Sequence, residues 1–310
     1  MITTKRTLNF VLIGINLAII LIIALFPSKE WMNYLVIVFI GILTYFSWLA
    51  HARFFGNPNK GKVLIISLLH KVCFGLSLST ASMIIIIGTI SLLGGYSEGS
   101  GFVEFDPVQP GSTGGFFETI ILYASSALAE ETMFRSIGIG ILMIPLAALY
   151  LKLTNAKSRI KEMNVRLVFR IGLILNIFIA LAFGFVHKGS PGFGLIPFLN
   201  ICLSGFIYGY LFLQHRDIVS AWSMHLSWNL IQMFCGLPVS GKYVPSTSLA
   251  DSFISGAKDS VIAGGDYGPE GSIITLLVQT GLILLLFTKL KSTRQSTGAT
   301  IRSELTQMQT

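Results

Sequence analysis

Long apolar runs constrain the fold of this chain more than any other feature. A helix needs about 20 apolar residues to cross a lipid bilayer. Eight runs reach or approach that length, and they span residues 8–26, 31–49, 70–93, 117–150, 169–187, 195–213, 218–235 and 272–290. Charged residues make up only 12% of the chain, about half of their usual share in a soluble domain. The pattern predicts an all-α, polytopic membrane protein with about eight transmembrane helices.

The basic residues predict how this protein is oriented in the membrane. Lys5 and Arg6 precede the first apolar run, and no small-residue cleavage site follows it. We therefore expect a retained helix rather than a signal peptide. If the helices alternate in direction, most of the remaining Lys and Arg residues share a side with the N-terminus. The positive-inside rule then places both termini in the cytoplasm, in a cell membrane of the bacterial inner-membrane type.

Two loops rich in Gly, Ser and Pro suggest a division of the chain into three parts. They cover residues 94–115 and 236–271 on the predicted outer face, where they are either disordered or folded over the helices. The first part, residues 1–115, holds the N-terminal transmembrane helices and an outer loop. The second, residues 116–235, is a central membrane core. The third, residues 236–310, holds an outer loop, the last helix and a cytoplasmic tail.

The cysteines do not indicate a disulfide framework. There are three of them, Cys73, Cys202 and Cys235, and all lie in apolar runs without a CxxC pair. We expect free thiols buried in the core, and neither disulfides nor a cysteine metal site.

Charged residues inside an apolar run are rare and usually functional, and residues 128–136 read LAEETMFRS. Glu131 and Arg135 are four positions apart, so they share one helix face and can form an ion pair. Glu130 is turned by about 100° from Glu131, which leaves it free to face a cavity as a general base. The alternative is a structural charge cluster that locks helices together.

Two further motifs place one histidine at the end of an apolar run and another inside one. FGFVH ends at His187, and HLSWN places His225 and Asn229 one helical turn apart. A His and an Asn on one face can stabilise the oxyanion that forms when water attacks a carbonyl group. The alternative is an interhelical hydrogen bond, a role that we expect for Asn176 and Asn200.

Together these groups indicate direct attack by an activated water on an amide, without a Ser or Cys nucleophile. The predicted helix boundaries, however, put the three motifs at different depths in the membrane. Their convergence requires tilted helices, or a fourth helix that begins as an interfacial segment. The side on which a cleft opens stays undecided at this point.

The order and spacing of the three motifs resemble the CPBP family, the CAAX proteases and bacteriocin-processing enzymes also called the Abi family. EETMFR matches its EExxxR motif, FGFVH its FxxxH motif and HLSWN its HxxxN motif, within about residues 116–235. The resemblance implies an intramembrane endopeptidase related to the type II CAAX prenyl endopeptidases. Its substrate would be a membrane-associated peptide or protein, for example a lipid-modified or amphipathic precursor, and no nucleic acid is involved.

The resemblance also implies roles for individual residues. Glu130 is the general base that activates water, with His187 assisting, while His225 and Asn229 stabilise the oxyanion. Glu131 and Arg135 support the site. No cofactor or metal is expected; the alternative is Zn²⁺ bound by Glu130, His187 and His225, although the compact HExxH arrangement is absent from the sequence.

Two other functions compete with the endopeptidase. A catalytically silent membrane scaffold of the same fold would usually have lost motif residues, and all of them are present here. A transporter with a carboxylate proton relay would show broken helices or repeat symmetry, and neither is clear in the sequence.

Overall fold

A computed structural model of the chain describes residues 63–98, 112–143, 165–242, 254–257 and 261–288, together with positions 146, 149 and 153. The longer helices are α3 (Val63–Leu92), α4 (Ser112–Glu131), α6 (Val165–Val186), α7 (Leu195–His215) and α8 (Val219–Phe234), followed by an unlabelled helix, Ile273–Thr288. A π-helix, η1 (Thr132–Ile141), continues α4 directly. The strands β1 (Tyr96–Glu98) and β2 (Ile254–Ala257) form a small antiparallel sheet, which the all-α prediction did not include.

The helical, membrane-type character of the chain is confirmed. Three described helices contain segments long and apolar enough to cross a membrane, namely Leu68–Leu92, Phe169–Val186 and Leu195–His215. The helix Ile273–Thr288 is apolar but shorter. The predicted runs 8–26 and 31–49 and both termini lie outside the described residues, so the count of eight helices and the cytoplasmic termini stay predictions.

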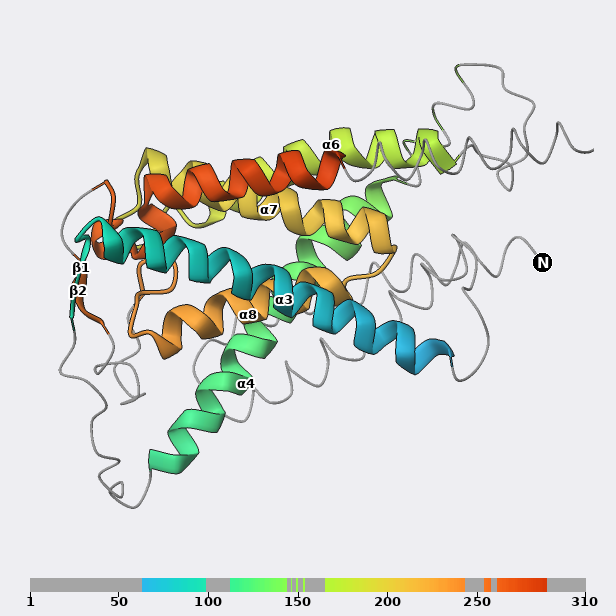
Figure 1. The fold of residues 1–310 in the computed structure, drawn as a ribbon. Coiled ribbons are helices and arrows are strands. Elements are labelled where there is room, and N and C mark those ends of the chain that lie inside the picture. The colour runs from blue at the N-terminus through green and yellow to red at the C-terminus, as the bar shows by residue number, and fades with distance from the viewer. Residues whose placement is uncertain are drawn as a thin grey trace, which may run out of the picture.

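The helices pack in a layered bundle (Figure 1). α3 lies along α8, α6 lies along α7, and α7 also contacts α8. α4 crosses α8 at a steep angle and continues through η1 toward α6 and α7. Within the described part of the apolar run 117–150, the helix therefore changes its winding at Thr132. This crossing brings the middle of the run into the bundle.

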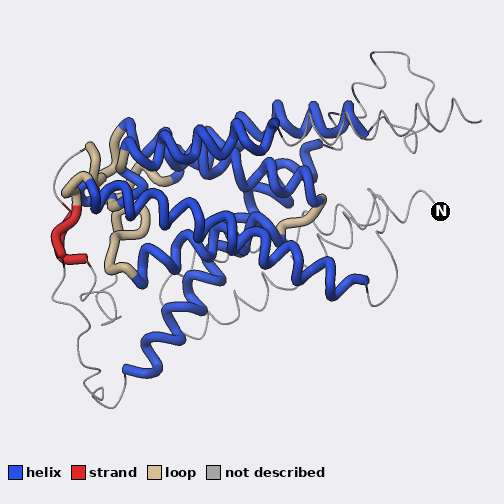
Figure 2. Tube along the Cα trace, in the orientation of Figure 1, coloured by secondary structure: helices blue, strands red, loops and turns tan. Residues whose placement is uncertain are grey.

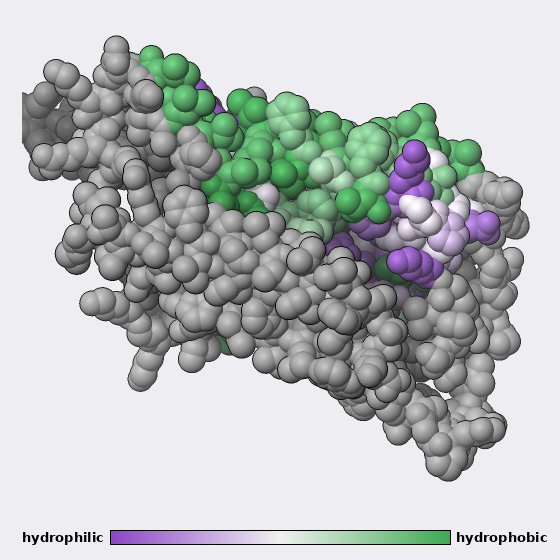
Figure 3. All heavy atoms as spheres, turned by 180° about the vertical axis from the view of Figure 1, so that it is seen from behind, coloured by the Kyte–Doolittle hydropathy of each residue, from purple (hydrophilic) through white to green (hydrophobic). Residues whose placement is uncertain are grey.

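The outward face of α6 is apolar. Its exposed side chains recur three or four positions apart, as on one face of a helix, and include Ile174, Ile177, Phe178, Leu181 and Phe185. Figure 3 shows apolar residues across the visible described surface, with hydrophilic residues gathered toward one end. A continuous apolar surface of this kind is what a lipid bilayer covers.

α6 and α7 approach each other closely because α7 carries glycines where they meet. A Cβ atom at Gly209 would lie 1.8 Å from Oδ1 of Asn176. Asn176 Nδ2 donates a hydrogen bond to the Phe206 carbonyl at 2.9 Å, which confirms the predicted interhelical role of this residue. Asn200 instead donates hydrogen bonds to the carbonyls of Glu270 and Ser272, which belong to a loop. The interhelical hydrogen bond expected for Asn200 is therefore wrong.

The loops and strands gather at one end of the bundle, which we call the loop end (Figure 2). α3, α6 and α8 end there, and α7 begins there. β1 comes from the first predicted outer loop and β2 from the second, and Tyr96 pairs with Ala257. The described parts of both loops are therefore folded over the helices rather than disordered.

The prediction for the cysteines holds only in part. All three are free, but only Cys202 is buried, whereas Cys235 is half-buried and Cys73 is exposed. The reason is that a residue in an apolar run of a membrane protein can face the lipid as well as the core.

Replacement of Gly209 by alanine tests the α6–α7 contact. The added methyl group displaces Asn176, so we expect a loss of about 1–3 kcal/mol in the free energy of unfolding. The matched control is Gly281→Ala, because a Cβ atom at this helical glycine meets nothing within 4 Å. Thermal unfolding in detergent should lower the midpoint for Gly209→Ala only; equal midpoints for the two variants would contradict the packing described here.

Candidate active site

A buried ion pair lies at the junction of α4 and η1. Arg135 NH1 is 3.1 Å from Glu131 Oε1, and neither side chain is exposed to solvent. The pairing follows from their spacing of four positions, as the sequence predicts. Removing two charges from water is unfavourable, so such a pair needs further polar partners.

Arg135 has such partners on α6 and α7. Its Nη2 atom donates a hydrogen bond to the Gly205 carbonyl at 3.1 Å. Its guanidinium carbon lies 4.5 Å from the ring centroid of Phe183 and 5.3 Å from that of Tyr208. Aromatic faces stabilise a cation by their negative potential, especially away from water. Arg135 thereby links η1 to two other helices.

His225 of α8 lies between the two glutamates. Its Nδ1 atom is 2.8 Å from Glu131 Oε1, and its Nε2 atom is 3.8 Å from Glu130 Oε2. A carboxylate paired with an arginine only accepts hydrogen bonds. Nδ1 therefore carries a hydrogen atom and donates a hydrogen bond to Glu131. The other ring nitrogen, Nε2, is therefore the one that faces Glu130.

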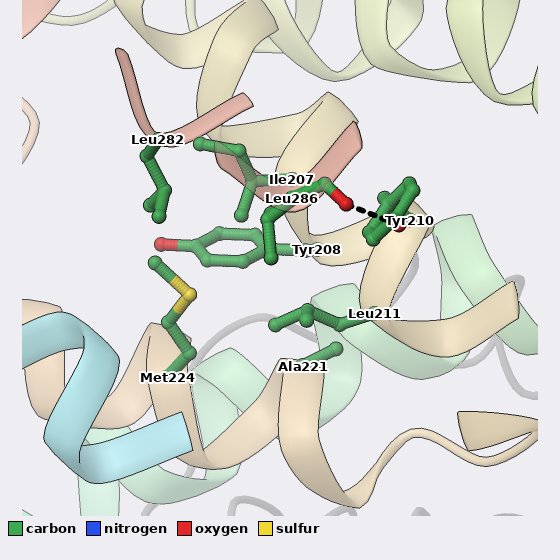
Figure 4. Packing of buried hydrophobic residues seen from close by; sticks show 8 residues of the cluster. All are labelled: Ile207, Tyr208, Tyr210, Leu211, Ala221, Met224, Leu282 and Leu286. Carbon is green, nitrogen blue, oxygen red and sulfur yellow. Dashed lines mark hydrogen bonds between the residues drawn. The ribbon is translucent and has the colours of Figure 1, made fainter. Parts of the chain in front are cut away.

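Tyr208 of α7 fixes the plane of the His225 ring. The two rings are stacked at 4.9 Å between centroids, with 14° between their planes. Tyr208 is itself held in a buried cluster, where Figure 4 shows it beside Leu282 and Met224. His225 can therefore neither tilt nor rotate without disturbing this cluster.

Glu130 has a different environment from its neighbour Glu131. About a third of its side chain is exposed, 30% against 0% for Glu131. The hydroxyl group of Ser126, one turn earlier, donates a weak hydrogen bond at 3.4 Å to Glu130 Oε1. Of the two glutamates only Glu130 is partly exposed, although its Oε2 atom, which faces His225, is buried without a hydrogen-bond partner among the described residues.

The ring of Phe183 connects His187 to the rest of the site. His187 Nδ1 donates to the Phe183 carbonyl at 2.8 Å, which leaves Nε2 of the neutral ring as an acceptor. The Phe183 ring contacts His187 at 5.0 Å and His225 at 6.2 Å, both edge to face. The three motifs, which the predicted boundaries put at different depths, thus meet around one side chain.

The described structure brings the predicted residues together to different degrees. Hydrogen bonds or ion pairs connect Glu130, Glu131, Arg135 and His225. His187 joins them through Phe183, and Asn229 is buried on α8 one turn after His225. The catalytic roles of these residues stay predictions.

Three contributions to this site were missed in the sequence. The bond from His225 to Glu131 joins residues 94 positions apart. Tyr208 lies in an apolar run with no pattern that distinguishes it from other core aromatics, and Gly205 acts through its carbonyl. None of these signals is local, so spacing could not reveal them.

Whether a metal ion takes part in the reaction stays a prediction. Within the described ranges, no group of three or more His, Cys, Asp or Glu residues is arranged to hold a metal ion. Glu130 and His225 face each other, and the bond from Nδ1 of His187 to a backbone carbonyl is of a kind that orients metal-ligating histidines as well as metal-free ones.

Comparison with known proteins agrees with the resemblance seen in the sequence. Residues 112–231 match the family model described as type II CAAX prenyl endopeptidase Rce1-like. The predicted CPBP-type character is confirmed for this segment, which carries all three motifs and points to a CAAX-type endopeptidase. No curated protein and no solved structure matches the chain.

Replacement of Arg135 by alanine tests the buried ion pair. The change leaves Glu131 without its cation in a dry environment, and we expect a loss of about 3–5 kcal/mol of stability. The amount of folded protein in membranes should fall. Glu130→Gln is the control, because its partly exposed carboxylate lies outside the pair, and its amount should match the wild type. If the amount of folded protein fell equally in both variants, Glu130 would be as important for folding as the ion pair, which contradicts the different environments described for the two glutamates.

Proposed function

We propose that this protein is an intramembrane endopeptidase that cleaves a membrane-associated protein or peptide with a water activated by Glu130. The observation that carries the proposal is the difference between the adjacent carboxylates. Glu131 is buried and paired with Arg135 and His225. Glu130 is partly exposed and turns its Oε2 atom, which is buried and has no hydrogen-bond partner in the described parts of the chain, toward His225 Nε2, 3.8 Å away. This distance is longer than a direct hydrogen bond.

In the proposed reaction Glu130 takes a proton from the water, and the water oxygen attacks the carbonyl carbon of the scissile bond. A tetrahedral intermediate forms, and its negative oxygen requires hydrogen-bond donors. When the intermediate collapses, the carbon–nitrogen bond breaks and the proton passes from Glu130 to the leaving amine. The products are a carboxylic acid and an amine, so the one water is fully accounted for.

The histidines and Asn229 have distinct parts in this proposal. His225 and the Asn229 amide act as donors to the oxyanion, and His225 can do so only while Nε2 carries a proton. Glu131 holds the opposite nitrogen of that ring and so sets its orientation. His187, whose Nδ1 is fixed by a carbonyl, presents Nε2 as an acceptor that assists in positioning the water. Arg135 balances the charge of Glu131.

The membrane setting supports a substrate that is itself held in the bilayer. The apolar face of α6 and the apolar helices place the bundle among lipids. A membrane-tethered segment, lipid-modified or amphipathic, is already concentrated in that layer. We propose a cell membrane of the bacterial inner-membrane type, with both termini cytoplasmic, from the distribution of basic residues.

A catalytically silent scaffold is the second candidate function. The observation in its favour is that the Arg135 guanidinium contacts the rings of Phe183 and Tyr208. These contacts would hold the helices together even if the protein catalysed no reaction. The position of Glu130 favours the enzyme, since its 3.8 Å distance to His225 is too long for a direct hydrogen bond that would hold helices together.

We further propose that the reaction needs no metal ion. Incubation with a zinc chelator, followed by its removal, should then leave cleavage unchanged, because Glu130 alone activates the water. The measurement is the initial rate on a membrane-tethered peptide, with a known zinc peptidase treated in parallel. A rate lost on chelation and restored by Zn²⁺ would instead support the zinc alternative.

Glu130→Gln tests the proposed catalytic base. The amide cannot accept the proton of water, so a general-base contribution of about 10²- to 10⁴-fold is lost while the fold remains. Peptide termini are compared by mass spectrometry in membranes that hold the wild type or the variant at equal levels. A terminus found only with the wild type supports the protease and names its substrate. Identical termini, with the variant still supporting the phenotype of the cell, would favour the scaffold.

A further inference from the structure

The segment Gly264–Ser272, which we call the clasp, lies outside the region that matches the family. It contains two short 3-10 turns, Gly265–Tyr267 and Pro269–Gly271. Although it is a loop, its residues Tyr267 and Glu270 are buried. A carboxylate in such a place needs hydrogen-bond partners, because its desolvation is otherwise unfavourable.

Glu270 bridges α8 and the loop that follows it. Its Oε1 atom accepts hydrogen bonds from Trp228 Nε1 at 2.9 Å and from Gln232 Nε2 at 3.2 Å. Its Oε2 atom accepts from the Ser240 backbone nitrogen at 2.8 Å and from the Ser240 hydroxyl at 2.9 Å. Hydrogen bonds to an ionised carboxylate are stronger than those between neutral groups. Glu270 therefore holds α8 and the loop around Ser240 together.

The two α8 donors lie on either side of Asn229 and within two helical turns after His225. Trp228 is three positions after His225 and adjacent to Asn229, and Gln232 is three positions after Asn229. Residues three or four apart lie on neighbouring parts of one helix surface. Holding Trp228 and Gln232 therefore determines the rotation and the axial position of the turn that carries His225 and Asn229.

The clasp is anchored to α7 as well. Asn200 Nδ2 donates to the carbonyls of Glu270, at 2.7 Å, and Ser272, at 2.9 Å. Tyr267 joins the buried cluster that contains Phe183, the ring between His187 and His225. The segment thus contacts the helices on both sides of the candidate active site.

We propose that Glu270 is a positioning residue of the active site. Through Trp228 and Gln232 it holds α8 at the rotation at which His225 bonds to Glu131 and faces Glu130. The catalytic consequence rests on the proposed function, whereas the effect on α8 does not.

Glu270→Gln tests this role, with Asp266→Asn as the control. Glutamine keeps the size of the side chain but turns one acceptor into a donor that faces other donors. Asp266 is an exposed carboxylate of the same segment, so its amide changes the charge without touching α8. Two properties are measured on the full-length protein in detergent: hydrogen exchange of the backbone amides, and the pH dependence of kcat/KM on the cleaved peptide.

We expect Glu270→Gln to raise hydrogen exchange in Val219–Phe234 several-fold over the control, with α6 unchanged. kcat should fall roughly 10- to 100-fold, because misplacement by about 1 Å has that effect, while KM changes little. The pH profile of kcat/KM should also shift, since His225 is displaced from its two carboxylates. Trp228→Phe, which removes only one donor to Glu270, should produce the same changes to a smaller degree, and it serves if Glu270→Gln does not fold.

Each other outcome counts against the proposal. Unchanged exchange in α8 overturns it, whether or not the protein is active. In another outcome, hydrogen exchange rises throughout the chain, while the pH profile of kcat/KM is lowered but keeps its shape. This outcome would show that Glu270 serves general folding, and it would overturn the proposal as well. A wild type that cleaves nothing contradicts the proposed function instead, and the exchange of α8 then decides alone whether Glu270 holds this helix.

Discussion

The buried ion pair of Glu131 and Arg135 is the interaction on which the rest of the site depends. A guanidinium group away from water needs a carboxylate, a carbonyl and polarisable neighbours, and these come from different helices. Gly205 and Tyr208 supply them from α7 and Phe183 supplies one from α6. His225 of α8 bonds to the same Glu131 oxygen that pairs with Arg135. Four helical segments thus contribute to one buried pair of charges, although Glu131 Oε2 and Arg135 Nε have no hydrogen-bond partner within the described structure.

The same constraint separates the two adjacent glutamates. Adjacent residues of a helix are rotated by about 100° from each other, so only Glu131 can face Arg135. Glu130 stays at the edge of the packed region, where its carboxylate is partly exposed and opposite His225 Nε2. A single arginine thereby makes one carboxylate structural and leaves the other available for chemistry, and the orientation of His225 follows from the structural one.

The segment that carries the motifs is not self-sufficient. α8 holds His225 and Asn229, but its loop end is fastened by Glu270, which follows the matched region by many residues. The helix Ile273–Thr288 then packs on α7 beside Tyr208, where the Tyr210 hydroxyl donates to the Leu286 carbonyl (Figure 4). Residues after the motifs therefore support both rings, those of Tyr208 and His225, that are stacked in the site.

By itself the sequence determined the local features: the apolar helices, the pairing of Glu131 with Arg135 and the different direction in which Glu130 points. These depend on residues within one or two helical turns, where periodicity fixes geometry. Only the tertiary structure decided the bond from His225 to Glu131, the steep crossing of α4, the exposure of Cys73 and the burial of Glu270. Such features join residues far apart in the chain or depend on which face of a helix meets lipid. No local pattern encodes either, because both follow from how whole helices pack.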